Sequence, residues 1–119
     1  AEPLSVAGTQ PTGRDPLTGL RDGRTARAFA AARLKAAPAP AALIALLVSV
    51  TRYDAINAAF GRRAGDAVLQ AAARRIERVA ADLGGRPLVA RMAGAEFAVL
   101  LSAPATLAEA GMLAQQLVD

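Results

Sequence analysis

The hydrophobic pattern changes its period within residues 69–101, and this change limits the possible folds more than any other feature of the chain. Apolar residues first recur at spacings of three and four, which places them on one face of an α-helix. These residues are Leu69, Ala72, Ile76, Val79 and Leu83. From Leu88 to Leu101 the side chains alternate instead, as they do along strands. The sequence therefore predicts an amphipathic helix, ended by a left-handed cap at 83–85, and then an antiparallel hairpin with its tip at 93–96.

The rest of the chain predicts further helices around one more strand. Residues 42–50 are rich in aliphatic side chains and carry no charge, which favours a central strand that is buried on both faces. The other predicted elements are a compact turn at 15–20, helices at 25–37 and 54–60, and a final helix after Pro104. This order predicts an α/β fold, in which helices cover a sheet centred on the 42–50 strand and the hairpin.

The chain length and the distribution of Pro and Gly predict one domain. A length of 119 residues supports a single hydrophobic core. Residues 1–14 are rich in small and turn-forming residues without periodicity, so we expect a linker or flexible arm there and one domain over 15–119. No apolar run reaches the roughly 18 residues that cross a bilayer, and no signal-peptide pattern is visible. We therefore expect a cytoplasmic segment of a larger protein, without membrane contact of its own.

The composition excludes several classes of chemistry. The chain has no cysteine and no histidine, which removes disulfides, thiolate nucleophiles, histidine bases and most zinc sites. Carboxylates, hydroxyls, arginines and backbone groups remain. The net charge of +4 is spread along the chain and aromatic residues make up only 3%, so stacking platforms for nucleic acid are missing. We expect no nucleic-acid partner.

Three segments resemble the motifs of one known family in order and spacing. They are "DPLTGL" at 15–20, "VSVTRYDAINAAFGRRAGDAVL" at 48–69 and "VARMAGAEFAVLL" at 89–101. The family is the GGDEF domain, the bacterial diguanylate cyclase domain that makes cyclic di-GMP from two GTP molecules. The resemblance implies a nucleotidyl-cyclase-like palm fold with a central, mostly antiparallel sheet. It also implies that the domain is truncated at its C-terminus, because the family continues with a further strand and a helix that clamps the phosphates.

The chain departs from the family at the positions that the resemblance assigns to magnesium. In active members the ions are held at the positions that are Ser49, Val50 and Ala95 here. The turn that corresponds to the family motif reads Ala93, Gly94, Ala95, Glu96 and Phe97. Magnesium prefers oxygen ligands that include carboxylates, and of the assigned ligands only the backbone carbonyl of Val50 is kept. The resemblance therefore implies no metal site, no catalytic residue and a degenerate cyclase that is not an enzyme.

The resemblance implies that the guanine-binding site of the family is kept and that its inhibitory site is absent. Guanine binding is implied at Asn57 and Asp66, which makes GTP a ligand that is bound without being hydrolysed, and no other cofactor is expected. A structural explanation stays open, in which Asn57 closes the short helix and Asp66 lies at the N-terminus of the long one. The inhibitory cyclic di-GMP site falls on Gly84 and Pro87, so we expect it to be absent. Arg91 is kept, and we expect it to pack its stem on the sheet and pair locally.

Three hypotheses for the function follow. The first is a catalytically inactive regulatory module of a cyclic di-GMP signalling protein that retains guanine binding and acts on other domains of its polypeptide or on a partner protein. The second is a protein interaction or homodimerisation domain with a vestigial site. The third is a residual cyclase that uses Ser49, Glu96 and water around a metal.

Overall fold

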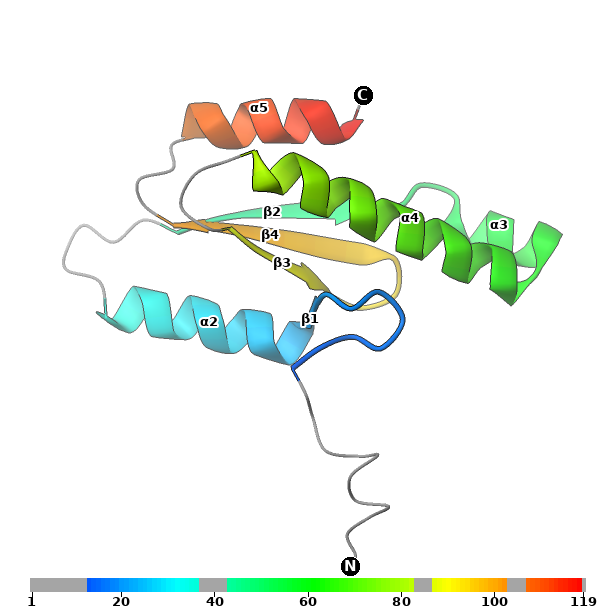
Figure 1. Ribbon diagram of the computed structural model, residues 1–119, viewed down its shortest axis with the longest axis horizontal. Coiled ribbons are helices and arrows are strands. Elements are labelled where there is room, and N and C mark those ends of the chain that lie inside the picture. Colours follow the sequence, from blue (N-terminus) through cyan, green and yellow to red (C-terminus); the bar gives the residue numbers. More distant parts are fainter. Residues whose placement is uncertain (1–12, 37–42, 83–86, 103–106, 119) are drawn as a thin grey trace, which may run out of the picture.

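The computed structural model describes residues 13–36, 43–82, 87–102 and 107–118. Helices and strands alternate irregularly along the chain (Figure 1). The elements are β1 (Arg21–Asp22), α2 (Gly23–Ala36), β2 (Leu43–Ser49), α3 (Tyr53–Phe60), α4 (Arg62–Ala81), β3 (Leu88–Arg91), β4 (Glu96–Ser102) and α5 (Leu107–Val118). Among the described residues, no helix is both long enough and apolar enough to cross a membrane.

The strands form one sheet with the order β1-β3-β4-β2. Strands β3 and β4 are the two arms of an antiparallel hairpin, and β2 pairs antiparallel with the other side of β4 up to the pair Ser49 and Glu96. Only β1 is parallel to its neighbour, β3. This mostly antiparallel sheet, covered by helices, confirms the predicted α/β palm-like fold.

The helices lie on both faces of the sheet. Figure 1 shows α4 and α5 on one face and α2 on the other. The larger core lies between the sheet and α4 with α5, and it includes the fully buried Phe97, Leu69 and Leu113. The smaller core on the α2 side is built around Ala26, Ala90 and Leu100. The predicted amphipathic helix and hairpin are therefore confirmed, and together they supply most of the main core.

The predicted place of the 42–50 strand was wrong. Strand β2 lies at the edge of the described sheet, and β3 and β4 are the strands with a neighbour on each side. One face of β2 packs towards α5, while Leu47 on the other face is 71% exposed. An unbroken apolar run was ambiguous here, because it gives the hydrophobicity of a strand but not its neighbours. The core beside α2 includes Leu43 at the start of β2, whereas Leu47 further along the same strand is exposed.

Two other expectations concern the ends of elements. Helix α4 ends at Ala81, and Asp82 caps it with φ −75°, so the helix stops before the predicted cap at 83–85. Residues 83–86 and residues 1–12 lie outside the described part of the chain. Gly13 accepts a hydrogen bond from the amide of Asp22. The division into a linker at 1–14 and a domain at 15–119 stays a prediction.

Candidate functional site

The turn between β3 and β4 lies beside the end of β2. It contains Gly94 at φ +62°, a left-handed conformation that glycine adopts without strain. The amide of Val50 donates to the carbonyl oxygen of Ala95 at 3.1 Å, and Ser49 pairs across the strands with Glu96. The structure therefore brings together Ser49, Val50 and Ala95, the three positions that the resemblance assigns to magnesium. Their sequence separation of more than forty residues is closed by the β2–β4 pairing.

The donor atoms at this place do not match what Mg²⁺ prefers. Position 49 offers a hydroxyl, position 95 offers only a methyl group, and the exposed Glu96 supplies the neighbouring carboxylate. Within the described residues no cluster of three or more acidic, histidine or cysteine side chains could hold a metal ion. The remaining turn residues divide by burial, because Ala93 and Gly94 are exposed whereas Phe97 is fully buried in the main core.

The predicted guanine-binding residues lie on two consecutive helices. Asn57 is on α3 and Asp66 is on α4, and Gly61 at φ +92° links the two helices. The Asn57 side chain presses against Gly65, so that a Cβ atom added to Gly65 would lie 1.8 Å from the Asn57 Oδ1 atom. Because Gly65 directly precedes Asp66, Asn57 is held beside the backbone that carries the carboxylate. Figure 1 places α3, the first part of α4 and the β3–β4 turn at one end of the sheet.

The contacts of these two residues leave the structural explanation open. Asn57 closes α3 only through its backbone oxygen, which accepts from the amide of Gly61, and any residue could do this. Its Oδ1 atom is buried without a hydrogen-bond partner in the described residues. Asp66 is the fifth residue of α4, beyond the first turn that a capping acid occupies. Both side chains therefore retain polar capacity that the described fold does not use.

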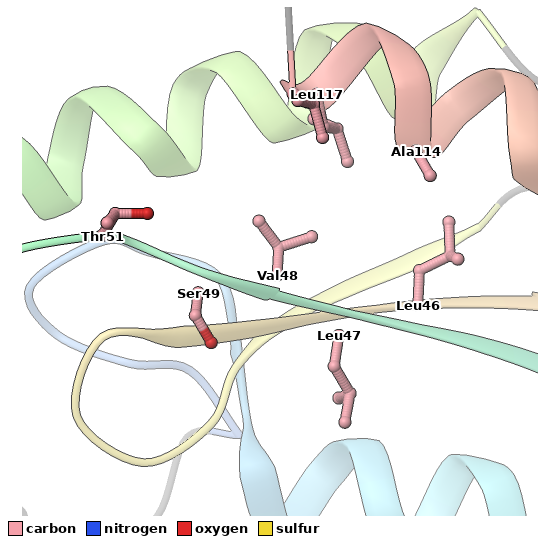
Figure 2. Close-up of a pocket in the computed structure, with 8 residues that line it drawn as sticks. Leu46, Leu47, Val48, Ser49, Thr51, Ala114 and Leu117 are labelled. Carbon is pink, nitrogen blue, oxygen red and sulfur yellow. The ribbon is translucent and has the colours of Figure 1, made fainter.

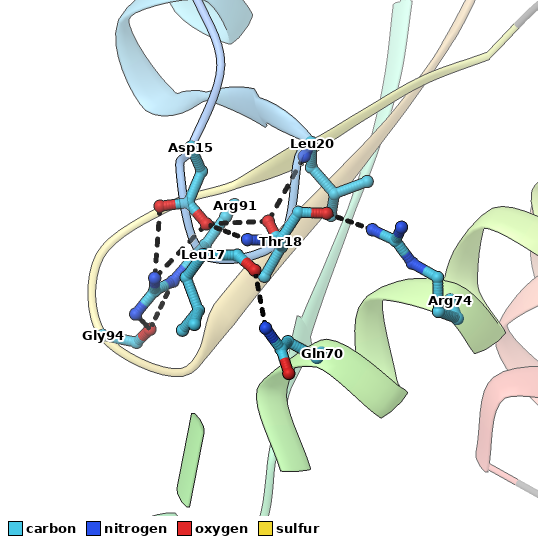
Figure 3. A network of polar contacts seen from close by, with 8 residues as sticks. All are labelled: Asp15, Leu17, Thr18, Leu20, Gln70, Arg74, Arg91 and Gly94. Carbon is cyan, nitrogen blue, oxygen red and sulfur yellow. Dashed lines mark hydrogen bonds and ion pairs between the residues drawn. The ribbon is translucent and has the colours of Figure 1, made fainter. Parts of the chain in front are cut away.

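Arg91 fastens the turn to the loop at residues 15–20 (Figure 3). Its Nε and Nη2 atoms donate to the carbonyl oxygen of Gly94 at 3.1 and 3.0 Å. Its Nη1 atom forms an ion pair with the Asp15 carboxylate at 3.2 Å. The local pairing expected of Arg91 is confirmed. The Asp15 partner was not predicted, because it lies 76 residues earlier and no local pattern points to it.

The Asp15 carboxylate is also bound within its own loop. The Thr18 amide and hydroxyl both donate to Oδ2, at 2.9 and 2.7 Å. Burial alone would raise the pKa of Asp15, but these hydrogen bonds and the Arg91 charge outweigh it, so the pKa lies below its usual 3.8. A lowered folded-state pKa means that the stabilisation is complete above the unfolded-state value and is lost as the pH falls through the folded-state value.

We expect the stability of the Asp15→Asn variant to depend less on pH than that of the parent, because the variant lacks this carboxylate. The variant should be less stable than the parent at neutral pH, and the difference should shrink as the pH falls below about 4. Urea unfolding curves across this range measure the effect, with Asp82→Asn as a control at an exposed carboxylate. An unchanged difference at all pH values would contradict the expected role of Asp15.

A groove of about 350 Å³ lies between β2 and α5. Figure 2 shows Leu46 and Val48 pointing towards Ala114 and Leu117 on α5, while Leu47 points to the opposite face of the sheet. Ser49 and Thr51 line the groove where β2 ends. This groove was not predicted, because the apolar run at 42–50 was interpreted as a central strand.

Of the two positions predicted for the missing inhibitory site, the structure describes one. Pro87 lies half-buried directly before β3, whereas Gly84 lies outside the described residues. The absence of this site therefore stays a prediction.

Comparison with known proteins identifies one family for nearly the whole chain. Residues 12–119 match the model described as "Diguanylate cyclase, GGDEF domain". The chain is 42% identical over 57 residues to the probable diguanylate cyclase DgcF of Escherichia coli K12. This matched segment covers 48% of the chain and 17% of DgcF. It spans between 9% and 17% of the length of the curated relatives that it matches.

Solved structures give the same result. The GGDEF domain of TpbB (YfiN) from Pseudomonas aeruginosa superposes with a TM-score of 0.78 at 34% identity, covering 88% of this chain and 60% of the other. Diguanylate cyclase SiaD from the same organism was solved in complex with its activator SiaC. It superposes with a TM-score of 0.76 at 28% identity, and the match covers 96% of this chain and 43% of the SiaD chain.

These matches overturn the prediction that the chain is not an enzyme. The matched model describes a diguanylate cyclase domain, and a relative that is 42% identical over its matched segment has the same activity in its name. That prediction followed from the missing carboxylates at Ser49 and Ala95. The residual cyclase of the third hypothesis, which uses Ser49 and Glu96, ranked below it, and the fold pairs these two residues across neighbouring strands.

Proposed function

This chain belongs to the GGDEF family of diguanylate cyclase domains, and we propose that it binds guanine nucleotide between α3 and α4 and thereby regulates a larger cyclic di-GMP signalling protein. The observation that carries the proposal is the close packing of the Asn57 side chain against Gly65, the residue that precedes Asp66. The buried Asn57 Oδ1 atom has no partner in the described residues, and no hydrogen bond or ion pair to them occupies the Asp66 carboxylate. A cytoplasmic location, where GTP is available, is part of this proposal.

The chemistry of guanine suits these two side chains. The N1 and N2 groups of guanine are hydrogen-bond donors on one edge, and a carboxylate accepts from both at once. An amide can meet the rest of that edge. Adenine lacks this pair of donors, so a site of this kind would leave the carboxylate unpaired with adenine and discriminate between the bases.

The regulatory part of the proposal rests on the length and the neighbours of the chain. The chain spans a minor part of the curated relatives, and the structural neighbour SiaD is solved with an activator protein. A domain that binds nucleotide can shift a partner's activity only if the bound and free states differ in their contacts with that partner. We propose that other domains of the same polypeptide, or a separate signalling protein, provide these contacts.

Replacing Asp66 tests the binding part. Asp66→Ala should weaken GTP binding by about tenfold or more, because a hydrogen bond to a charged group contributes about 1.5–3 kcal/mol. Calorimetric titration measures the loss, with ATP as the base-specificity control. Asp82→Ala removes the same charge at the far end of α4 and should bind GTP like the parent. Absence of GTP binding by the parent, or equal binding by the Asp66→Ala variant, would refute the proposed site.

A second candidate function is diguanylate cyclase chemistry. The observation that favours it is the cross-strand pair of Ser49 and Glu96, which puts a hydroxyl and a carboxylate on the same face of neighbouring strands. Incubation with GTP and magnesium or manganese, followed by chromatography, detects cyclic di-GMP. Product that disappears in Glu96→Gln would support this candidate, and no product above a buffer blank would oppose it.

A further inference from the structure

The Arg91 side chain is half-buried, and its three guanidinium nitrogen atoms contact two different segments. Its side chain is 19% exposed, and that of its partner Asp15 is 15% exposed. Two nitrogens bind the carbonyl oxygen of Gly94 in the turn, and the third binds Asp15 in the 15–20 loop. Removing one partner of this partly buried ion pair would leave the other charge without its counter-charge.

Backbone hydrogen bonds also hold the turn among the described residues. Within the hairpin, the amide of Met92 donates to the oxygen of Glu96 at 2.8 Å, and the amide of Glu96 donates to the oxygen of Ala93 at 3.2 Å. Outside the hairpin, the amide of Val50 donates to the oxygen of Ala95 at 3.1 Å. The Gly94 carbonyl, between those of Ala93 and Ala95, is the group that Arg91 holds. Its direction therefore depends on where the guanidinium lies.

The guanidinium is in turn placed by a loop that is fixed on helix α4 (Figure 3). The Gln70 side chain donates to the carbonyl oxygen of Leu17 at 3.1 Å, and Arg74 donates to that of Thr18. The loop is closed on itself by a bond of 2.7 Å from the amide of Asp15 to the oxygen of Leu20. Asp66 lies one helical turn before Gln70 on the same face of α4. One loop thus connects the turn to the helix that carries Asp66.

We infer that Arg91 and Asp15 are positioning residues for the nucleotide site, holding the turn at 93–96 in register with helix α4 through the 15–20 loop. Arg91 acts through the Gly94 carbonyl, and Asp15 acts through Arg91. The consequence for nucleotide affinity rests on the proposed function, whereas the position of the turn does not.

Two conservative substitutions separate the two contacts. Arg91→Lys keeps the positive charge for Asp15, but a single ammonium group cannot reproduce the forked contact with the Gly94 oxygen. Asp15→Asn removes the charge that orients Arg91 and keeps the size of the side chain. Arg78→Lys, at an exposed position on α4, is the matched control.

Amide hydrogen exchange of the protein without nucleotide tests the positioning directly. The reporters are the amides of Val50 and Glu96, whose bonds fix the turn. In both Arg91→Lys and Asp15→Asn we expect exchange at these amides to be about tenfold faster, while amides of the main core, such as those of Ile76 and Val99, keep their protection. A purely structural role would lower protection at all of these amides together. That result, or unchanged exchange at the turn, would overturn the inference.

Nucleotide titration then tests the consequence for binding. If the turn forms part of the nucleotide site, Arg91→Lys should weaken GTP binding about fivefold, since a loosened segment must be ordered again when the ligand binds. Unchanged GTP affinity in a variant whose turn exchanges faster would refute the link to the site. If the parent protein bound no GTP, the proposed function would fail, and the exchange measurement would still decide whether Arg91 holds the turn.

Discussion

Aspartates at positions 49 and 95 are expected to make GTP binding by this domain strongly dependent on Mg²⁺. The amide of Val50 donates to the oxygen of Ala95 at 3.1 Å, so the two new carboxylates would lie on adjoining segments next to Glu96. A pair of unit charges about 4 Å apart interacts by roughly 4 kcal/mol at an effective dielectric of 20. We expect the Ser49→Asp/Ala95→Asp variant to bind GTP about a hundredfold more tightly with Mg²⁺ than in a chelator, because the carboxylates would otherwise repel the triphosphate.

The control for this prediction is a double variant with asparagine in place of aspartate at both positions. Ser49→Asn/Ala95→Asn introduces side chains of the same size without charge, and its response to Mg²⁺ should equal that of the parent. Calorimetric titrations of all three proteins with GTP, with and without Mg²⁺, measure the effect. An equal response of the aspartate and asparagine variants would show that these positions do not form a metal site.

Gly65→Ala is expected to destabilise the domain and displace the Asn57 amide. The added Cβ would lie 1.8 Å from Oδ1 and 2.7 Å from Cγ of Asn57, so the whole amide must move. Overpacking of this kind costs about 1–3 kcal/mol. The affinity for GTP should fall as well, because the displaced amide no longer lies beside Asp66.

The chain provides a close control in Gly111, which also lies within a helix and has no atom within 4 Å of an added Cβ. Gly111→Ala should raise the free energy of unfolding by about 0.5–1 kcal/mol, from helix propensity alone. Adding Asn57→Ala to Gly65→Ala should restore stability but not GTP binding. Urea unfolding and calorimetry measure the two quantities separately. Equal stability of the two glycine variants would contradict the tight packing at Gly65.

Patterns within short stretches of sequence predicted the elements, and the contacts between distant stretches decided the rest. The spacing of Leu69 and Ile76 was enough to predict the buried face of α4, because helical periodicity is a local property. The edge position of β2 could not be predicted, since an apolar strand has the same composition in either place. The ion pair of Asp15 with Arg91 was hidden for a similar reason. Two charged residues 76 positions apart give no local signal of their contact.

For the candidate site, too, the sequence predicted the residues but not all of their contacts. The resemblance identified Asn57, Asp66 and the turn, and the β2–β4 register brings Ser49 next to that turn as expected. The close packing of Asn57 against Gly65 was not predicted, because it depends on the angle between two helices joined at Gly61. The prediction that the chain is not an enzyme rested on the missing carboxylates at Ser49 and Ala95, and the family match overturns it.

The two cores on either side of the sheet are unequal, and this inequality sets an order of local unfolding. The core beside α2 has three buried members, Ala26, Ala90 and Leu100, with partly buried side chains around them, whereas α4 packs into the larger core that contains Phe97. The layer that buries less apolar surface opens at lower free energy. Because the 15–20 loop is fixed to α4 by Gln70 and Arg74, we expect α2 to open at lower free energy than the turn at 93–96. Local opening on the side of α2 would then leave the rest of the domain, with the proposed nucleotide site, folded.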